Sequence, residues 1–438
     1  MIFPRTQPVH AWDVYRTGSQ AAPTVAEIVS DAMQTFTRLW WACDPVLPET
    51  QRLRSQAEQT AAEKEMDRFS QTVQDALKEL PATAAGQQAI RQRLLPEACR
   101  TAKTVFDLQD AHLDALQIDE FAETATQFVR QARRFDPQLS FADIYQAARN
   151  VITTNMLQRL WGMPVTMNQA LFAYSMLYPY TDNYLDDPAL SGAQKLDFSR
   201  RFSQRLEGAA VRPANAHEAQ IFGLVAMIEA EYDRRLYPQV FHSLLAIQHA
   251  QTRSLALLNP GAAPYTLDVI GISLEKGGTS TLADGYLAAG DLTPRQAEFA
   301  FGLGAFLQLG DDLEDVLVDR KAGIQTVFSQ VAGRWPLDAL TNRTMHFGLH
   351  VFDLLDDLGT SPVLCEFVRQ CTFQPFVTAV HRAHKFYTRP YLRQIEQRSA
   401  FRYRHLEKQA RWLHRQQRGL LAAVEGFLLN ADGRSGEE

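Results

Sequence analysis

Apolar residues recur at intervals of three and four positions along most of the chain. The pattern is clear in residues 62–80 (AEKEMDRFSQTVQDALKEL) and in residues 141–161 (FADIYQAARNVITTNMLQRLW). This spacing places the apolar side chains on one face of a helix. Alternation of apolar and polar residues between turns, which is typical of strands, is hard to find. The pattern therefore predicts an all-α fold with no sheet, or at most a stray strand.

Three of these helices have clear start and stop signals. A Ser or Thr that can cap a helix precedes each one, and a Gln three residues later completes a capping-box pattern in two of them. Gly and Pro mark the stops, because both interrupt a helix. The predicted helices run from Ser140 to about Trp161, from Thr166 and Gln169 to a point before Pro188, and from Thr293 and Gln296 to about Lys321, with Gly323 as the stop.

One large helical domain is the simplest organisation for these elements. The segment PATAAG, residues 81–86, is the best linker candidate, because Pro and Gly punctuate helical patterns. We therefore expect an N-terminal helical extension over residues 1–85, a main domain over residues 86–430 and a disordered tail over residues 431–438.

The composition excludes several classes of protein. The 438 residues include 44 Lys and Arg against 50 Asp and Glu, a formal net charge of -6. Binding to nucleic acid needs clustered basic residues, so we expect no nucleic-acid partner. No apolar run reaches the about 20 residues that span a membrane. The four scattered cysteines favour a reducing compartment, and we expect a cytoplasmic protein.

Two groups of aspartates stand near the ends of predicted helices. Like charges four residues apart on a helix repel by roughly 0.2–0.5 kcal/mol per pair. The helix dipole disfavours each carboxylate in a C-terminal turn by roughly 0.3–1 kcal/mol. A solvated acidic face is the simpler explanation, but conflicts between local rules tend to mark functional sites. The groups are Asp182, Asp186 and Asp187, and Asp311, Asp312, Asp315 and Asp319.

An apolar, partly aromatic stripe precedes each acidic group. Tyr178 and Tyr174 lie one and two turns before Asp182 on the same helix face. Gln308 and Phe301 precede the second group in the same way. A stripe of this kind alone is more often part of a core. Followed by aspartates in both cases, it predicts an apolar well with a negatively charged rim.

Carboxylates without neighbouring Cys or His are hard ligands that suit Mg²⁺. In proteins Mg²⁺ usually binds through one or two carboxylates and completes its coordination with substrate phosphates. A negative rim can therefore hold metal ions, which in turn hold a diphosphate. A diphosphate above an apolar well describes a site for a linear prenyl diphosphate.

At these residues the sequence resembles the class I isoprenoid synthases, the all-α family of prenyl diphosphate synthases and terpene cyclases. Residues 182–187 (DNYLDD) are similar to the first aspartate-rich motif of the family, in a variant form. Residues 306–326 (FLQLGDDLEDVLVDRKAGIQT) are similar to the second. Residues 273–290 (SLEKGGTSTLADGYLAAG) resemble the helix that carries a diphosphate-binding lysine, here Lys276. The resemblance covers roughly residues 86–419.

The resemblance implies a helical bundle around a central apolar cavity, with about three Mg²⁺ ions that assist ionisation of the substrate. The metal ligands would be the seven aspartates named above, with Asp182, Asp186, Asp311, Asp312 and Asp315 carrying catalysis. Cationic and polar groups would bind the diphosphate, and aromatic faces would stabilise a carbocation. The substrate-binding residues so implied are Tyr174, Tyr178, Lys276, Phe301, Gln308, Arg253, Arg320, Arg402 and Tyr403.

Chain elongation needs a second diphosphate site, and the sequence has no clear equivalent of it. Its absence favours a terpene synthase, which cyclises or eliminates after ionising one substrate. However, an aspartate-rich motif stands where cyclases typically carry Asn-Asp, Ser and Glu. A prenyltransferase, either a polyprenyl diphosphate synthase or an enzyme similar to squalene and phytoene synthases, therefore stays open. In an enzyme similar to squalene and phytoene synthases, Asp315 and Asp319 would be the two aspartates that match the second motif of those enzymes. A non-catalytic protein that binds prenyl diphosphates is the third candidate.

A shared rim has a structural consequence, since both aspartate groups lie at helix C-termini. The two helices must then run parallel, with a long crossover between them. The basic segment at residues 381–420, with 11 Lys and Arg and two Glu, is compatible with peripheral contact with a membrane surface. Assembly into a homodimer stays open.

Overall fold

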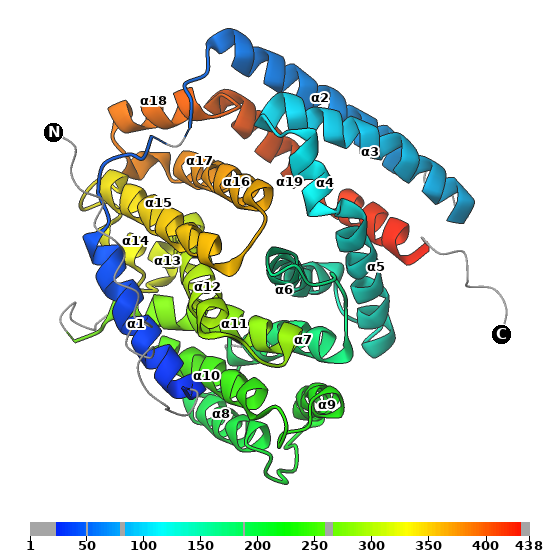
Figure 1. The fold of residues 1–438 in the computed structure, drawn as a ribbon, viewed down its shortest axis with the longest axis vertical. Helices are drawn as coiled ribbons and strands as arrows, with labels where there is room; N and C mark the ends of the chain where they lie inside the picture. The colour runs from blue at the N-terminus through cyan, green and yellow to red at the C-terminus, as the bar shows by residue number, and fades with distance from the viewer. Residues whose placement is uncertain (1–22, 50, 79–83, 187–188, 259–265, 431–438) are drawn as a thin grey trace.

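The computed structural model describes residues 23–49, 51–78, 84–186, 189–258 and 266–430. Within these ranges the chain is helical, and the only β-structure is one bridge between Ala332 and Trp335. The predicted all-α fold is therefore confirmed (Figure 1).

The helices, in chain order, are α1 (Val25–Ala42), α2 (Gln56–Lys78), α3 (Ala84–Phe106), α4 (Asp110–Leu116), α5 (Ile118–Phe135), α6 (Phe141–Leu160), α7 (Gln169–Asp186), α8 (Gly192–Leu206), α9 (Ala216–Glu231), α10 (Pro238–Ser254), α11 (Val269–Ala289), α12 (Pro294–Glu314), α13 (Val316–Ala322), α14 (Val327–Val331), α15 (Asp338–Asp353), α16 (Pro362–Cys371), α17 (Phe373–Arg382), α18 (Arg389–Arg398) and α19 (Tyr403–Asn430). In the part of the chain that the structure describes, three short 3₁₀ turns, η2 (Leu255–Leu258), η3 (Leu354–Leu358) and η4 (His384–Phe386), connect some of them.

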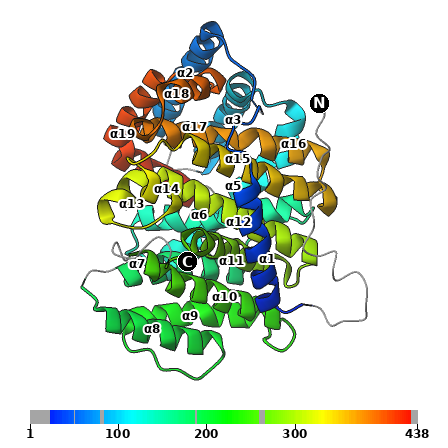
Figure 2. The same cartoon turned by 90° about the vertical axis from the view of Figure 1, so that its left-hand side faces the viewer.

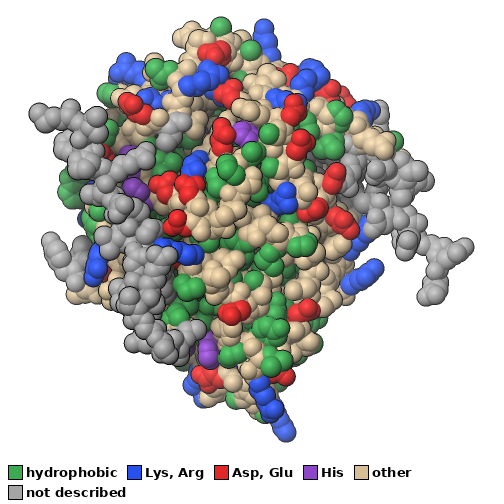
Figure 3. Space-filling view, in the orientation of Figure 1, with side chains coloured by type: hydrophobic (Ala, Val, Ile, Leu, Met, Phe, Trp, Pro, Cys, Tyr) green, Lys and Arg blue, Asp and Glu red, His purple; other side chains and the backbone are tan. Residues whose placement is uncertain are grey.

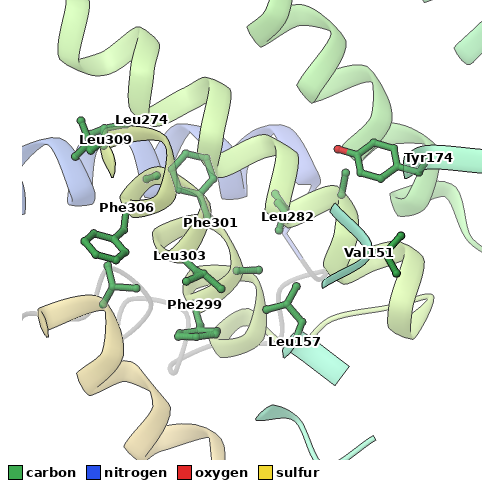
Figure 4. Close-up of a cluster of buried hydrophobic side chains, with 14 of the residues drawn as sticks. Val151, Leu157, Tyr174, Leu274, Leu282, Phe299, Phe301, Leu303, Phe306 and Leu309 are labelled. Carbon is green, nitrogen blue, oxygen red and sulfur yellow. The ribbon is translucent and has the colours of Figure 1, made fainter. Parts of the chain in front are cut away.

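Two helices joined by a tight turn, α11 and α12, form the centre of the bundle. Gly290 ends α11 with a positive φ, and Thr293 caps α12 through a capping box with Gln296. Helices α6, α7 and α10 pack against α11, whereas α15 and α17 pack against α12 (Figures 1 and 2). Buried apolar side chains fill the space between these layers, as Figure 4 shows for Leu282 and Phe299.

Helices α11 and α12 touch through their backbones at two glycines. A Cβ atom at Gly304 would lie 2.1 Å from the carbonyl oxygen of Gly277 and 2.6 Å from Oγ1 of Thr281. A Cβ atom at Gly277 would lie 2.2 Å from the carbonyl oxygen of Gly304. Neither position has room for a side chain, so the glycine pair sets the distance between the two central helices.

We expect Gly304→Ala to lower the free energy of unfolding by about 1–3 kcal/mol, because the added methyl group would force the two backbones apart. Urea unfolding followed by circular dichroism measures this change. The matched control is Gly223→Ala on α9, where an added Cβ meets no atom within 4 Å. That variant should gain about 0.4–1 kcal/mol from the reduced entropy of the unfolded chain. Equal stability of the two variants would contradict the prediction.

The first helix belongs to the core of the main domain. Phe36 on α1 is buried and stacks on Phe301 of α12, with ring centroids 5.9 Å apart. Trp40 is also buried, and its indole N–H donates to Oγ1 of Thr344 on α15 at 3.4 Å. Figure 2 shows α1 in front of the central helices, running across them. Helix α1, which falls within the extension expected over residues 1–85, is thus anchored in the bundle by apolar side chains.

A hairpin formed by α2 and α3 is the peripheral part of the N-terminal region (Figure 1). The carboxylate of Glu63 on α2 accepts from the backbone N–H of Arg402 at 3.0 Å and from its guanidinium. This ion pair ties the hairpin to the start of α19. Of the expected linker, residues 81–83 lie outside the described residues, as does the tail at residues 431–438, and α3 begins at Ala84.

The predicted helix boundaries are confirmed in part. Ser140 caps α6 through the backbone N–H of Asp143, as expected. Helix α7 begins at Gln169, but Asn168 rather than Thr166 accepts from the first turn, at the backbone N–H of Leu171. The carboxamide of Asn168 is closer to the exposed N–H groups, so the predicted capping box at Thr166 was wrong.

The helix predicted to continue to Lys321 ends earlier. Helix α12 stops at Glu314, and Asp315 interrupts it with φ near −90° and ψ near 5° before α13 begins. Gly323 then ends α13 in the left-handed conformation, as expected. The second acidic group is thus spread over two helices, with Asp319 on α13.

Candidate functional site

A cavity with about 1120 Å³ of empty space opens between five helices. Each helix contributes a polar side chain to its lining: Arg149 from α6, Tyr178 from α7, Gln251 from α10, Lys276 from α11 and Asp311 from α12. Two of these helices, α10 and α12, contribute residues of their C-terminal turns, Gln251 and Asp311, to the lining. Because helix C-termini carry partial negative charge, the mouth attracts cations even before its carboxylates are counted.

One carboxylate of each acidic group, Asp182 and Asp311, lies near this mouth. Oδ1 of Asp182 accepts from Nε2 of Gln251 at 3.0 Å, and Gln251 lines the same cavity as Asp311. Tyr178 is close enough to both carboxylates for their charges to act on its hydroxyl group. Burial raises the pKa of Tyr178 to about 12, and the negative charges of Asp182 and Asp311 add to that rise. Asp182 and Asp311 therefore both act on the same side chain.

Arg149 was missed by the sequence reasoning. Its guanidinium donates to Oδ1 of Asp311 at 3.0 Å, so α6 supplies a cation to the mouth. Burial raises the pKa of Asp311, and Arg149 opposes that rise. A signal for this residue was present: Gln146, Arg149, Asn150 and Thr153 form a polar stripe at helical spacing, and all four line the cavity.

Asp312 points to the other side of α12, toward α11. Its carboxylate accepts from Oγ of Ser273 at 2.8 Å and from Nε2 of Gln308 at 2.9 Å. Burial raises the pKa of Asp312 to about 6, and its two hydrogen bonds and the nearby Lys276 oppose that rise. Lys276 and Gln308, both expected to bind substrate, thus adjoin a buried carboxylate at the edge of the cavity.

Asp315 and Asp319 extend this acidic group onto α13. Burial raises the pKa of Asp319 to about 7, and the charges of Asp312 and Asp315 add to that rise. The pKa of Asp315 is also raised, first by burial and then by Glu314. The carboxylates around the break in the helix therefore raise one another's pKa values, and a cation placed among them would relieve the repulsion.

The donor set fits Mg²⁺ that arrives together with a phosphate ligand. Among the described residues, no three His, Cys, Asp or Glu side chains are grouped closely enough to hold a metal ion alone. Mg²⁺ needs only one or two carboxylates when phosphate oxygens supply further ligands. The described carboxylates that could serve are Asp182, Asp311, Asp312, Asp315 and Asp319. The side chain of Asp186 and the whole of Asp187 lie outside the described residues.

Five residues expected to bind substrate lie elsewhere. Phe301 is fully buried against Phe36, within the apolar cluster in Figure 4, and does not reach the cavity. The guanidinium of Arg320 lies over the ring of Phe386, 5.3 Å from its centroid. Arg402 pairs with Glu63, and Tyr403 stacks on His381 with ring centroids 4.6 Å apart. Arg253 pairs with Glu275, one residue from Lys276, but is absent from the cavity lining.

A small apolar pocket adjoins the cavity on the α7 side and shares Tyr178 and Ser280 with it. Tyr174, expected to line the well, is buried here, and its hydroxyl donates to the carbonyl oxygen of Ser280 at 3.1 Å. The rest of the pocket is mainly aliphatic and aromatic, with Leu177, Phe202, Leu206, Leu244 and Ile247 in its wall. On the α7 side a mainly apolar pocket thus lies next to the cavity with the polar mouth.

A second apolar cleft, also with about 1120 Å³ of empty space, lies between α6, α12, α16 and α17. Phe306, Phe352 and Phe376 line it, and it meets the first cavity at Asp311 and Leu307. Apolar side chains are visible across the middle of the face shown in Figure 3, between acidic and basic groups. One polar mouth therefore serves two apolar compartments.

A further acid, Asp284, was not singled out from the sequence. It lies on α11 at the inner end of the cavity and is 1% exposed. Its Oδ1 accepts from Nδ2 of Asn150 and from Oγ1 of Thr154, both at 2.8 Å. Burial raises the pKa of Asp284 to about 8. The sequence signal was a single charged residue in the otherwise uncharged segment TSTLADGYLAAG.

Within the described residues, no helix has both the length and the apolar character needed to cross a membrane. Comparison of the chain with protein-family models, with curated proteins and with solved structures finds no match.

Proposed function

We propose that this protein is a Mg²⁺-dependent class I terpene synthase. It would ionise a linear prenyl diphosphate and then cyclise the carbocation or eliminate a proton from it. The observation that carries the proposal is the meeting of two acidic helix ends, at Asp182 and Asp311, above a pocket with apolar walls. Neither a solvated acidic face nor an ordinary core produces that arrangement.

In this proposal the residues at the mouth of the cavity have different roles in binding the substrate. Lys276 and Arg149 carry the positive charges that hydrogen-bond to the diphosphate and hold it at the rim. Tyr178 and Tyr174 line the path inward, where their ring faces stabilise a cation. Mg²⁺, when bound by the aspartates, supplies Lewis-acid stabilisation of the leaving diphosphate. The aliphatic wall excludes water that would otherwise capture the carbocation.

The deciding experiment mixes purified protein and Mg²⁺ with geranyl, farnesyl and geranylgeranyl diphosphate, each with and without isopentenyl diphosphate. Release of diphosphate together with a hydrocarbon or alcohol from one allylic substrate supports the proposal. Products that form only with isopentenyl diphosphate would replace it with chain elongation. Substrate binding without any product would replace it with a carrier role.

One observation favours a prenyltransferase as the second candidate. The two apolar compartments meet at Asp311, so two prenyl chains could share one mouth. This geometry suits an enzyme that joins two allylic diphosphates, as in the expected similarity to squalene and phytoene synthases. A product with twice the carbon atoms of the single allylic substrate supplied would support this candidate over the first.

We expect Lys276→Ala to raise the KM for the allylic diphosphate about 10- to 100-fold, because a charge-assisted hydrogen bond contributes about 1.5–3 kcal/mol. Steady-state kinetics and calorimetric titration with inorganic diphosphate measure the change. Lys321→Ala is the matched control, since Lys321 is an exposed lysine on α13 outside the cavity lining. If Lys276→Ala had the same KM as Lys321→Ala, Lys276 would not bind the diphosphate.

A further inference from the structure

Three basic side chains gather where α13, the turn after α14 and η4 meet, at the edge of the bundle (Figure 2). The guanidinium of Arg320 lies over the ring of Phe386, 5.3 Å from its centroid, and Nζ of Lys385 lies 5.0 Å from the same centroid. Arg320 also lies against Gly333, where an added Cβ atom would come within 2.7 Å of its Nη2. Arg334 is the next residue in the chain. Together Arg320, Arg334 and Lys385 form what we call the basic patch.

The basic patch has no counter-charge in the described part of the chain. Its three side chains are exposed, and none of them forms an ion pair with a described carboxylate. Elsewhere in the basic segment at residues 381–420, Arg402 and Lys408 are neutralised by ion pairs with α2. Lys385 comes from the same segment but keeps its charge unpaired. The surface that can attract an anionic partner is therefore the basic patch.

Exposed apolar side chains accompany the basic patch. Trp335 directly follows Arg334 and is 64% exposed, and Val318 on α13 is exposed to the same degree. A β-bridge between Ala332 and Trp335 fixes the main chain of this turn. A single exposed apolar residue is ordinary. A Trp and a Val beside unpaired cations are instead typical of surfaces that bind at the interface between a bilayer and water.

We propose that the basic patch, together with Trp335 and Val318, docks this protein on a membrane surface that contains anionic lipids. The cations lie at the phosphate groups of the lipids, and the indole ring lies at the level of the headgroups. A nucleic acid is less suitable, because it calls for a longer row of cations and offers no apolar layer to Val318. The proposal does not depend on the proposed function.

Helix α13 brings the docking surface close to the candidate site. Asp319 on this helix belongs to the second acidic group: burial raises its pKa, Asp312 adds to the rise and Lys276 opposes it. Asp338, the other described acid near the basic patch, accepts from the backbone N–H of Thr388 at 3.1 Å. A docked protein would thus hold its acidic group one short helix away from the lipid, so that a lipid-soluble substrate or product has a short path.

The test measures how the purified full chain sediments with unilamellar vesicles. One vesicle contains phosphatidylcholine alone, and the other also contains about one third phosphatidylserine. The wild type should bind the anionic vesicles at least tenfold more tightly. About 1 M salt should remove this difference, because it shortens the Debye length to about 3 Å.

Two variants and one control assign the binding to this surface. In the double variant Arg334→Gln and Lys385→Gln, affinity for the anionic vesicles should fall about 20- to 30-fold, since each basic residue near such a surface contributes about fivefold. Trp335→Ser should lower it about tenfold. The matched control is the double variant Arg235→Gln and Leu236→Ser. It changes an exposed pair between α9 and α10, in the lower part of Figure 1, and should bind as the wild type does.

The contrary results are clear-cut, once circular dichroism shows that each variant is folded. A wild type without preference for anionic vesicles would overturn the proposal. Wild-type affinity in both patch variants would do the same, as would an equal loss of affinity in the control. Binding to an RNA duplex but to neither vesicle would replace the membrane with a nucleic acid. Release of diphosphate is assayed without vesicles, so none of these results affects the proposed function.

Discussion

Asp311→Asn is expected to lower kcat for diphosphate release by at least about 1,000-fold, which corresponds to about 4 kcal/mol of transition-state stabilisation. Asp311 lines the same cavity as Gln251, which donates a hydrogen bond to Asp182 of the other acidic group. The amide cannot supply the negative charge that holds a cation at the mouth. Arg149 would then lose its counter-charge. The affinity for the metal ion should therefore fall more than the affinity for the free diphosphate.

The measurement is a diphosphate-release assay over a range of Mg²⁺ concentrations. Asp353→Asn provides the matched control, because Asp353 is an exposed aspartate near the end of α15 outside the cavity lining. It should keep wild-type kinetics. Activity of Asp311→Asn within tenfold of the wild type at all Mg²⁺ concentrations would contradict the proposed site, and circular dichroism of the variant shows that the fold is intact.

Asp284→Asn is expected to make the protein more stable than the wild type by about 5 kcal/mol near pH 8, and to leave stability near pH 4 almost unchanged. The folded state raises the pKa of Asp284 from 3.8 to about 8, so it binds a proton that the unfolded chain releases. Wild-type stability from this group is full below pH 4 and is lost as the pH rises toward 8. About four pKa units at 1.36 kcal/mol each give the expected size.

Urea unfolding of both proteins between pH 4 and pH 9 measures this difference. Subtracting the two profiles removes the titration of every other group, because the proteins differ at one side chain only. The amide keeps an acceptor for Asn150 and Thr154, so the hydrogen bonds at Oδ1 survive in the variant. Parallel stability profiles would show that Asp284 has the same pKa in the folded protein as in the unfolded chain and would contradict the raised pKa.

The sequence was a good guide to local structure and to the two acidic groups. Ser140, Thr293 and Gly323 delimit helices as expected, because caps and left-handed stops depend on neighbouring residues only. The break at Asp315 was not foreseen. No Gly or Pro marks it, and the hydrogen bonds from the N–H groups of Asp315 and Asp319 to the carbonyls four residues earlier are kept.

Residues brought to the site by tertiary packing were harder to find. Arg149 and Asp284 approach the cavity from α6 and α11, and no spacing in the sequence connects them with the aspartates. The reverse error arose at Phe301, which shares a predicted face with Gln308 but faces α1 in the bundle. An apolar stripe on one helix does not show which other helix will pack against it. Here the covering helix is α1, which was expected to lie outside the main domain.

The glycine contact between α11 and α12 also indicates where the cavity can be remodelled. Because Gly277 and Gly304 touch through main-chain atoms, variation of nearby side chains leaves the separation of these two helices unchanged. The opposite wall is built from side chains, with Leu177, Phe202 and Leu244 meeting around the inner pocket. Engineering for longer or shorter prenyl chains should therefore substitute residues on α7, α8 and α10, where volume can change while the diphosphate end stays fixed.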